Sequence, residues 1–178
     1  MKLMVNTVEE FYSGLTSKKY FLDKTPRNLH IAKDLITYGS SSSKYIVLKR
    51  HPLAVLESIL DTWGEGKWIY HKYKIDLEEG LNKLCDIIES DSGNTCIISY
   101  EELTSNVEGI ALYIEKYLNI SVNHNNFSDI NLNGIMGDPK RTKYSKVVSK
   151  PITLNHLNKN PLRRYLAKSY IKKIGMRR

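Results

Sequence analysis

Basic and hydroxyl side chains are spaced for anion binding in KYIVLKRHPLAVLES, residues 44–58. Arg50 follows an apolar run typical of a buried strand, and Pro52 suits the first position of a helix. Ser58 lies eight residues beyond Arg50, inside that helix. A guanidinium, the free N–H groups of a helix start and a hydroxyl together form a clamp for a phosphate group. The alternative is a solvated loop arginine, with Ser58 on a polar stripe beside Asp61, and spacing alone favours this alternative.

Two other segments place polar residues directly after apolar runs. Lys24 and Arg27 belong to DKTPR, which follows the run KKYFL, and both could direct positive charge at the same ligand. Tyr100 ends the run NTCIISY and could stack on a nucleotide base or pack at the edge of the core. Taken singly, DKTPR is typical of a solvated turn, and Tyr100 favours neither interpretation.

These side chains can act together only if the surrounding elements bring them to one edge of a sheet. Hydrophobic periodicity predicts strands over KKYFL, KYIVLK and NTCIISY. It predicts helices over residues 7–15, 29–39, 52–63, 75–89, 107–118 and 161–174. This alternation is typical of an α/β fold, a three-layer parallel sheet with helices on both faces. Ligands of such sheets bind beyond the carboxyl ends of the strands, where Lys24, Arg50 and Tyr100 are expected.

The positive charge is concentrated at one end of the chain. Residues 1–139 hold 14 Lys and Arg against 19 Asp and Glu, a net charge of −5. Residues 140–178 hold 13 Lys and Arg and no acidic residue. A uniformly basic protein would suggest nucleic acid, whereas an acidic body with a basic end more simply serves an anionic cofactor or acceptor. Nucleic acid is therefore not the partner that we expect first.

Size and composition indicate one globular domain. The chain has 178 residues and is 41% hydrophobic, so it can bury a core, and we predict a single domain with a body over 1–139 and a basic segment over 140–178. The sequence contains no apolar run of about 18 residues and no signal-peptide pattern, and we expect a soluble, cytoplasmic protein. Cys85 and Cys96 lie in apolar segments without metal-ligand spacing, which predicts buried reduced thiols.

The order of these motifs resembles the sulfotransferases that use 3'-phosphoadenosine 5'-phosphosulfate. The resemblance covers about residues 20–145. In that family a Lys-Thr pair follows one strand, and a second strand ends in Arg-x-Pro with a Ser eight residues after the Arg. A third strand ends in Tyr-Glu-Asp/Glu-Leu. A Gly-Asp-Pro or Gly-Asp-Trp motif comes near the C-terminus. The matching positions here are Lys24-Thr25, Arg50-His51-Pro52 with Ser58, Tyr100-Glu101-Glu102-Leu103 and Gly137-Asp138-Pro139.

The resemblance implies a P-loop NTPase-like sulfotransferase fold and transfer of a sulfuryl group to a hydroxyl or amine. It implies that Arg50 and Ser58 hold the 3'-phosphate, that Tyr100 contacts the adenine, and that Lys24 neutralises charge on the bridging oxygen beside the sulfuryl group. Arg27 is a further candidate for cofactor binding. The acceptor would be a small molecule or a glycan, and the transfer needs no metal because a lysine and helix amides carry the charge.

The sequence departs from the family pattern in three places. The family's Gly-containing loop around the 5'-phosphosulfate should lie upstream of Lys24, and no such loop occurs in residues 1–23. We therefore expect an N-terminally shortened fold whose missing segment, or a partner chain, would supply the loop, and a chain that alone binds weakly and turns over little. One branch of the family has a catalytic His where Pro26 stands here, so the base is open among other residues: His30, His51 and Glu65. The late Arg-Lys pair of that branch is also absent, and basic residues after Asp138, such as Lys140 and Arg141, could compensate.

Two other functions stay open at this point. The basic end could make the chain a non-enzymatic module that binds RNA, DNA or a polyanionic glycan. A nucleotide kinase-like fragment is the third hypothesis, and the absence of a G-x-x-x-x-G-K-[ST] loop weakens it most. An aromatic, glycine-containing segment could line an acceptor pocket or pack at a helix corner. Its residues are Trp63, Gly64, Gly66 and Trp68. The final helix is expected to dock through Leu162, Tyr165, Leu166 and Ile174 with its basic face in solvent.

Overall fold

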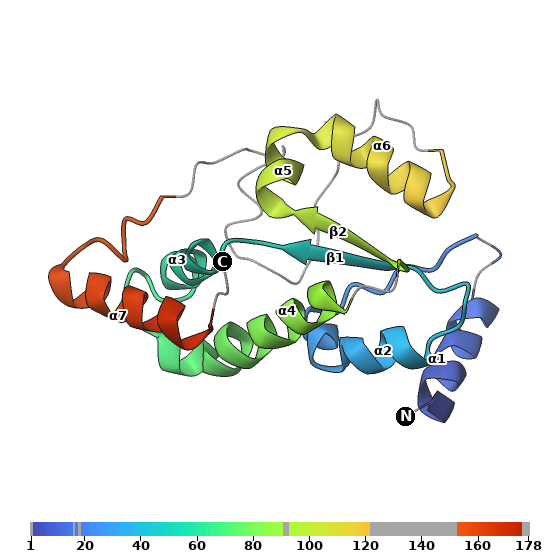
Figure 1. Ribbon diagram of the computed structural model, residues 1–178, viewed down its shortest axis with the longest axis horizontal. Coiled ribbons are helices and arrows are strands. Elements are labelled where there is room, and N and C mark those ends of the chain that lie inside the picture. Colours follow the sequence, from blue (N-terminus) through green and yellow to red (C-terminus); the bar gives the residue numbers. More distant parts are fainter. Residues whose placement is uncertain (1, 16, 18, 91–92, 122–152, 176–178) are drawn as a thin grey trace.

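The computed structural model describes residues 2–15, 17, 19–90, 93–121 and 153–175 of the chain. Helices and short helical turns form most of it, around one small sheet (Figure 1). The strands are β1 (Tyr45–Lys49) and β2 (Thr95–Ser99). The helices are α1 (Lys2–Gly14), η1 (Pro26–Ile31), α2 (Ala32–Tyr38), α3 (Pro52–Thr62), η2 (Tyr70–Tyr73), η3 (Ile75–Gly80), α4 (Leu81–Glu89), α5 (Tyr100–Ser105), α6 (Val107–Leu118) and α7 (Pro161–Lys173).

The sheet confirms two of the three predicted strands and their direction. β1 pairs with β2 in parallel, with Tyr45 opposite Thr95 and Lys49 opposite Ser99. The crossover between them runs through α3, η2, η3 and α4, as a parallel pair requires. Because both strands run the same way and end in register, the residues that follow Lys49 and Ser99 emerge together at one edge of the sheet.

The strand predicted over KKYFL is wrong within the described residues 19–22, which form no strand. Side chains hold this segment in place of a backbone ladder. Lys19 Nζ donates to the carbonyl oxygen of Asn119, and Tyr20 donates its hydroxyl to the carbonyl oxygen of Leu118 at 2.8 Å. The apolar run therefore secures the chain to the end of α6, while Phe21 and Leu22 remain exposed.

Helices lie on either side of the two strands (Figure 1). The described part of the sheet has two strands, so the three-layer parallel sheet stays a prediction. α5 and α6 lie on one side, and α2 and α4 on the other. Cys96 and Ile98 of β2 are buried, whereas their same-face partners on β1, Ile46 and Leu48, are 42% and 50% exposed. β1 is therefore half-covered, and differs from the fully buried central strand that its apolar sequence predicts.

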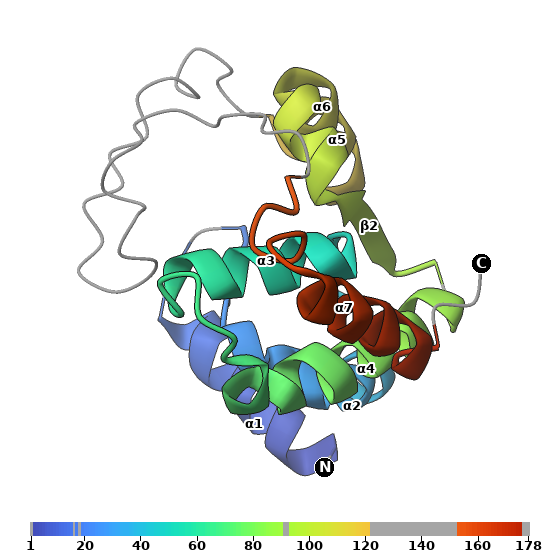
Figure 2. The same cartoon turned by 90° about the vertical axis from the view of Figure 1, so that its left-hand side faces the viewer.

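The core lies between α3, η3 and α7, away from the sheet (Figure 2). α7 docks through Ala167, Tyr170 and Ile174, which follow one another at helical spacing. Leu162 and Tyr165, which were expected to dock, are exposed instead because they lie outside the row 167–170–174. The prediction of a docked final helix is confirmed, and only its buried face is corrected.

Glu57 fastens the chain before α7 to α3. Its carboxylate is buried and accepts hydrogen bonds from the backbone N–H groups of His156, at 2.6 Å, and Leu157, at 3.0 Å. Arg163 adds a bond from its guanidinium to the carbonyl oxygen of His156 at 3.2 Å. A buried carboxylate with two backbone donors is stable in this position, since its charge is satisfied without a cation.

A second group of hydrogen bonds holds the C-terminal half of α7. Glu78, in the π-helical turn η3, accepts hydrogen bonds from Lys173 and from the hydroxyl of Tyr70, and Tyr170 donates to the carbonyl oxygen of Leu77 at 3.0 Å. Burial raises the pKa of Glu78, but the bonds from Lys173 and Tyr70 outweigh it and hold that pKa below its usual value. Burial and the same carboxylate raise the pKa of Tyr70.

The two cysteines differ in their environment. Cys96 is fully buried on β2, as predicted, and Cys85 lies exposed on α4. The predicted burial of Cys85 is wrong because its neighbours Leu84 and Ile88 face the protein while position 85 turns outward on the helix. Both thiols are free. Among the described helices, none combines the length and the apolar character needed to cross a membrane.

Candidate functional site

Arg50 and Tyr100 meet where the two strands end. Arg50 follows β1 and Tyr100 follows β2, and the in-register parallel pairing places them side by side. The guanidinium carbon of Arg50 lies 4.3 Å from the centre of the Tyr100 ring, a stacked cation–π contact. Arg50 Nε is buried and has no hydrogen-bond partner among the described residues. A buried N–H without an acceptor is costly, so this site suits an incoming anion that accepts from it.

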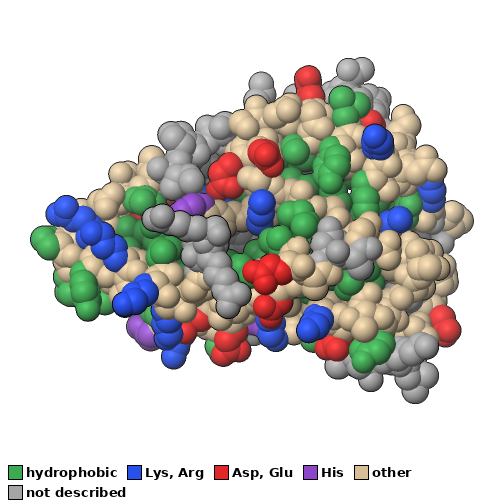
Figure 3. Space-filling view, viewed as in Figure 1, with side chains coloured by type: hydrophobic (Ala, Val, Ile, Leu, Met, Phe, Trp, Pro, Cys, Tyr) green, Lys and Arg blue, Asp and Glu red, His purple; other side chains and the backbone are tan. Residues whose placement is uncertain are grey.

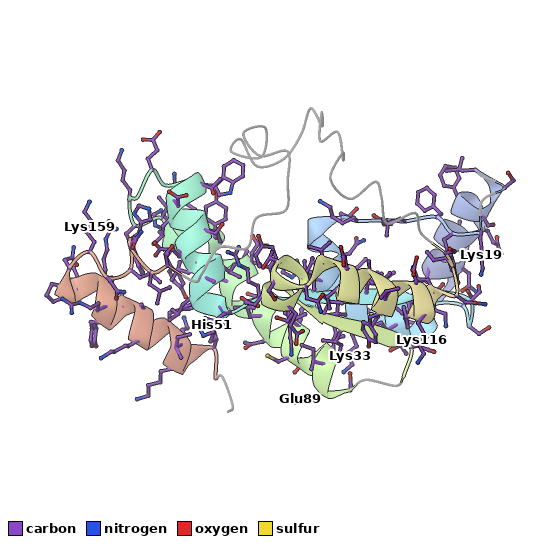
Figure 4. The ribbon with its side chains drawn as sticks, turned by 90° about the horizontal axis from the view of Figure 1, so that it is seen from above. Lys19, Lys33, His51, Glu89, Lys116 and Lys159 are labelled. Carbon is purple, nitrogen blue, oxygen red and sulfur yellow. The ribbon has the colours of Figure 1, made fainter. Side chains whose placement is uncertain are left out.

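The start of α3 is capped by His51, and this corrects the expectation of free helix amides. The His51 imidazole accepts at Nδ1 from the N–H of Leu53 at 3.2 Å. The N–H groups of Ala54 and Val55 both donate to the carbonyl oxygen of His51, at 2.8 and 3.1 Å, and Pro52 has no N–H. The first turn therefore offers an anion no free N–H. Among the described residues, the buried Nε of Arg50 is a donor at this edge that has no partner (Figure 4 labels His51 at the start of α3).

Glu101 links the ends of the two strands. One carboxylate oxygen accepts from the backbone N–H of His51 at 3.2 Å, and the other accepts from the hydroxyl of Ser99 at 3.0 Å. Burial raises the pKa of Glu101, but the hydrogen bonds from His51 and Ser99 and the nearby charge of Arg50 outweigh it and hold that pKa below its usual value. Glu101 is therefore an ionised carboxylate placed beside Arg50.

The other predicted site residues are not joined to Arg50 and Tyr100 by any hydrogen bond or ion pair within the described part of the chain. Ser58 lies further along α3 and is half-buried. Lys24 is exposed in the segment before η1. The backbone of Arg27 lies in η1, and its side chain is outside what the structure describes, as is the whole of Lys140. Their roles stay predictions.

The turn that carries Lys24 is built by its neighbour Asp23. The Asp23 carboxylate accepts from the hydroxyl of Thr25 at 2.7 Å and from the side-chain amide of Asn28 at 3.2 Å. The N–H of Asn28 also donates to the carbonyl oxygen of Thr25 at 3.0 Å. Three short-range bonds therefore fix the backbone on both sides of Lys24, while its ammonium group stays in solvent.

The three candidate bases have different surroundings. His30 Nε2 lies 3.4 Å from a carboxylate oxygen of Asp76, so a charged neighbour could orient its ring. The Nδ1 atom of His51 is already occupied by the cap, and Glu65 is an exposed residue with a left-handed backbone, at φ 48°. Among the described residues, no group of three or more His, Cys, Asp or Glu could hold a metal ion.

The aromatic segment after α3 divides between packing and exposure. Trp68 packs against the core and stacks on Tyr70, with ring centres 6.0 Å apart. Gly64 is crowded, because a Cβ there would lie 2.7 Å from the carbonyl oxygen of Lys67, and Gly66 has φ +76° beside the ring of His156. Trp63 is exposed. Trp68 and the two glycines therefore pack at the helix corner, whereas the role of exposed Trp63 in an acceptor pocket stays a prediction.

Sequence reasoning does not assign a role to Glu101 or Glu57. Glu101 is visible in the sequence as the residue after Tyr100, but its contact with His51 crosses 50 residues and depends on the strand register. Glu57 lies on the apolar face of α3 and is buried. A single carboxylate at such a core position is the signal in the sequence that buried backbone N–H groups lie nearby.

Comparison with known proteins gives one structural match to report. A solved structure described as the sulfotransferase domain from the curacin biosynthetic pathway aligns with 97% of this chain and 68% of its own, at a TM-score of 0.58 and 18% sequence identity. No protein-family model and no curated protein matches the sequence. At this identity the likeness concerns the fold, and the chain therefore has a sulfotransferase-like α/β fold.

Proposed function

We propose that this chain is a sulfotransferase domain that binds 3'-phosphoadenosine 5'-phosphosulfate beyond the carboxyl ends of β1 and β2, within a three-layer P-loop-like fold. The observation that carries the proposal is the buried Arg50 Nε, which has no acceptor among the described residues and lies against Tyr100. A phosphate oxygen would supply the missing acceptor. The sulfotransferase-like fold supports this choice of ligand over other anions.

Each candidate residue has a distinct role in the proposal. Arg50, between β1 and α3, donates to the 3'-phosphate, and the hydroxyl of Ser58 in α3 donates to it as well. Tyr100 contacts the adenine with the part of its ring that Arg50 leaves uncovered. Arg27 and Lys140 add positive charge around the nucleotide. When bound, the donor supplies a sulfuryl group whose S–O bond to the 5'-phosphate breaks as a hydroxyl or amine attacks.

Lys24 is assigned to the sulfuryl end of the site. Its exposed ammonium group, on a turn fixed by Asp23, can neutralise negative charge that develops on the bridging oxygen. His30 is the base that we favour, because its Nε2 atom lies 3.4 Å from a carboxylate oxygen of Asp76, which can orient the ring. A lysine placed to stabilise charge during transfer contributes little to binding of the product nucleotide, and this separates its role from that of Ser58.

The test compares two variants in two assays. Isothermal titration with 3'-phosphoadenosine 5'-phosphate should show that Ser58→Ala weakens binding by about tenfold to a hundredfold, the effect of one hydrogen bond to a charged group. Lys24→Ala should bind like the wild type within about twofold. With ³⁵S-labelled donor and a panel of hydroxyl and amine acceptors, the wild type should transfer little sulfate, and Lys24→Ala less still. Equal binding by wild type and Ser58→Ala would remove Ser58 from the site, and no binding by the wild type would refute the nucleotide assignment.

A second candidate function, polyanion binding, is favoured by the outer face of α7. Arg164, Lys168 and Lys172 follow one another at a spacing of four residues, about 6 Å apart along the helix. All three are exposed and make no ion pair with a described residue. Tyr165 lies beside them and is 69% exposed. Basic side chains gather over this end of the molecule in the space-filling view (Figure 3).

Heparin binding distinguishes the two functions. If α7 binds polyanions, affinity for heparin should fall steeply with salt, and the triple variant Arg164→Gln, Lys168→Gln, Lys172→Gln should lose most of it. Lys33→Gln with Lys116→Gln removes two exposed charges elsewhere and serves as the control (Figure 4). Arg50→Ala should leave heparin binding unchanged. Equal binding by the triple variant and the control would exclude the α7 face.

A further inference from the structure

Glu101 occupies a special place between the two strand ends. Its two carboxylate oxygens accept from Ser99, the last residue of β2, and from the N–H of His51, the residue between Arg50 and α3. It is the neighbour of Tyr100, on which Arg50 stacks. One side chain therefore bonds to the backbone of the residue after Arg50 and to the hydroxyl of the residue before Tyr100.

Arg50 and Glu101 form no ion pair, although the charge of Arg50 is close enough to act on the Glu101 carboxylate. No ion pair within 4 Å joins Arg50 to Glu101 among the described residues, because the Glu101 oxygens are directed to Ser99 and His51. The Arg50 guanidinium lies on the Tyr100 ring with its Nε buried and unpaired. If the strand end could move, the Arg50 side chain would sample many conformations. Binding an anion would then cost the conformational entropy of fixing one of them.

We propose that Glu101 is a positioning residue, which seats the turn between β1 and α3 so that Arg50 is held against Tyr100 with its donors free for an anion. This inference rests on the proposed function for its ligand, and on the contacts of Glu101 for its geometry. The role is a structural one that acts through Arg50. It therefore depends on the hydrogen bonds that Glu101 accepts and much less on its negative charge.

Three variants separate these contributions. Glu101→Gln keeps an acceptor for the His51 N–H and can still bond to Ser99, but has no charge. Glu101→Ala removes both bonds. Glu102→Ala is the matched control, because Glu102 is the next residue, is equally acidic, and has an exposed side chain without a described contact. Thermal melting of all three shows whether each variant is folded, and a folded Glu101→Gln keeps the proposal testable if Glu101→Ala unfolds.

The first measurement needs no ligand. The Nε–Hε signal of Arg50 in two-dimensional ¹H–¹⁵N spectra should be shifted by the ring of Tyr100, and Tyr100→Leu gives its position without the ring. We expect Glu101→Gln and Glu102→Ala to keep the wild-type signal and Glu101→Ala to move it toward that of Tyr100→Leu. A wild-type signal in Glu101→Ala would overturn the proposal, and so would a displaced signal in Glu102→Ala.

The second measurement is a double-mutant cycle with 3'-phosphoadenosine 5'-phosphate. Glu101→Ala should weaken binding about tenfold in the wild-type background and less than about twofold in the Arg50→Ala background, because it acts through Arg50. Glu101→Gln should bind as tightly as the wild type or more tightly. The same loss in both backgrounds would refute a role through Arg50. If the wild type does not bind the nucleotide, the proposed function fails, and the ligand-free spectra still decide the positioning role.

Discussion

Replacement of Glu57 by Ala should release the chain before α7 from α3. Glu57 is buried, and its carboxylate accepts from the N–H groups of His156 and Leu157. Hydrogen bonds to a charged group contribute about 1.5–3 kcal/mol each, and their removal leaves two N–H groups without an acceptor. Because the two bonds share one carboxylate, we expect a total loss of about 3–5 kcal/mol in the free energy of unfolding.

Two assays measure the effect of Glu57→Ala. For a domain of this size the loss corresponds to a fall of roughly 6–20 °C in melting temperature, measurable by circular dichroism. Hydrogen exchange followed by mass spectrometry should show faster exchange in the peptide around residues 153–158. Glu57→Gln should also be destabilising, since its amide nitrogen would face one of the two backbone donors.

Glu79→Ala is the control for this prediction, because Glu79 is exposed and makes no described contact. It should change the melting temperature by less than about 2 °C. If Glu57→Ala melts and exchanges like Glu79→Ala, the two backbone hydrogen bonds do not hold the C-terminal segment and the reasoning is refuted.

Two further predictions concern titration and thiol reactivity. The pKa of Glu78 is lowered in the folded protein, so its contribution to stability is present above the pKa that it has in the unfolded chain and is lost as pH falls through the folded value. Chemical unfolding between about pH 3 and pH 7 should therefore show a weaker acid dependence for Glu78→Gln than for wild type, and equal curves would contradict this role. With a thiol reagent under native conditions, exposed Cys85 should react much faster than Cys96, even though burial and the charges of Glu89 and Asp86 raise the pKa of the Cys85 thiol. Cys96 should react only on unfolding, since it is fully buried on β2 and burial raises the pKa of its thiol. A fast reaction that survives in Cys85→Ser would show that Cys96 is accessible.

Local patterns predicted the elements on which the candidate site stands. The apolar run KYIVLK was sufficient to predict a strand. Pro52 was sufficient to predict the turn and the helix start after it, since Pro is favoured at the first helical position. α6 has the predicted bounds, Val107–Leu118, because an Asn cap precedes it and Asn119 ends it in a left-handed conformation. Parallel pairing of β1 with β2 followed from the helices between them.

Long-range contacts account for what the sequence did not predict. KKYFL is apolar enough for a strand, but Lys19 and Tyr20 bond to the end of α6, almost 100 residues away. The free amides expected at α3 are occupied because the imidazole of His51 turns back onto Leu53, an orientation that its residue type permits but does not require. Glu101 acquires its role only after the strand register has brought it to His51.

Binding of a matched pair of nucleotides to wild type and Arg50→Ala tests the central claim most directly. Adenosine 5'-phosphate and 3'-phosphoadenosine 5'-phosphate differ only in the 3'-phosphate that Arg50 is proposed to hold. The wild type should prefer the 3'-phosphorylated nucleotide by at least about tenfold in isothermal titration, and Arg50→Ala should lose that preference while it melts like the wild type. A wild type that does not distinguish the two nucleotides, or an Arg50→Ala variant that keeps the full preference, would contradict the account.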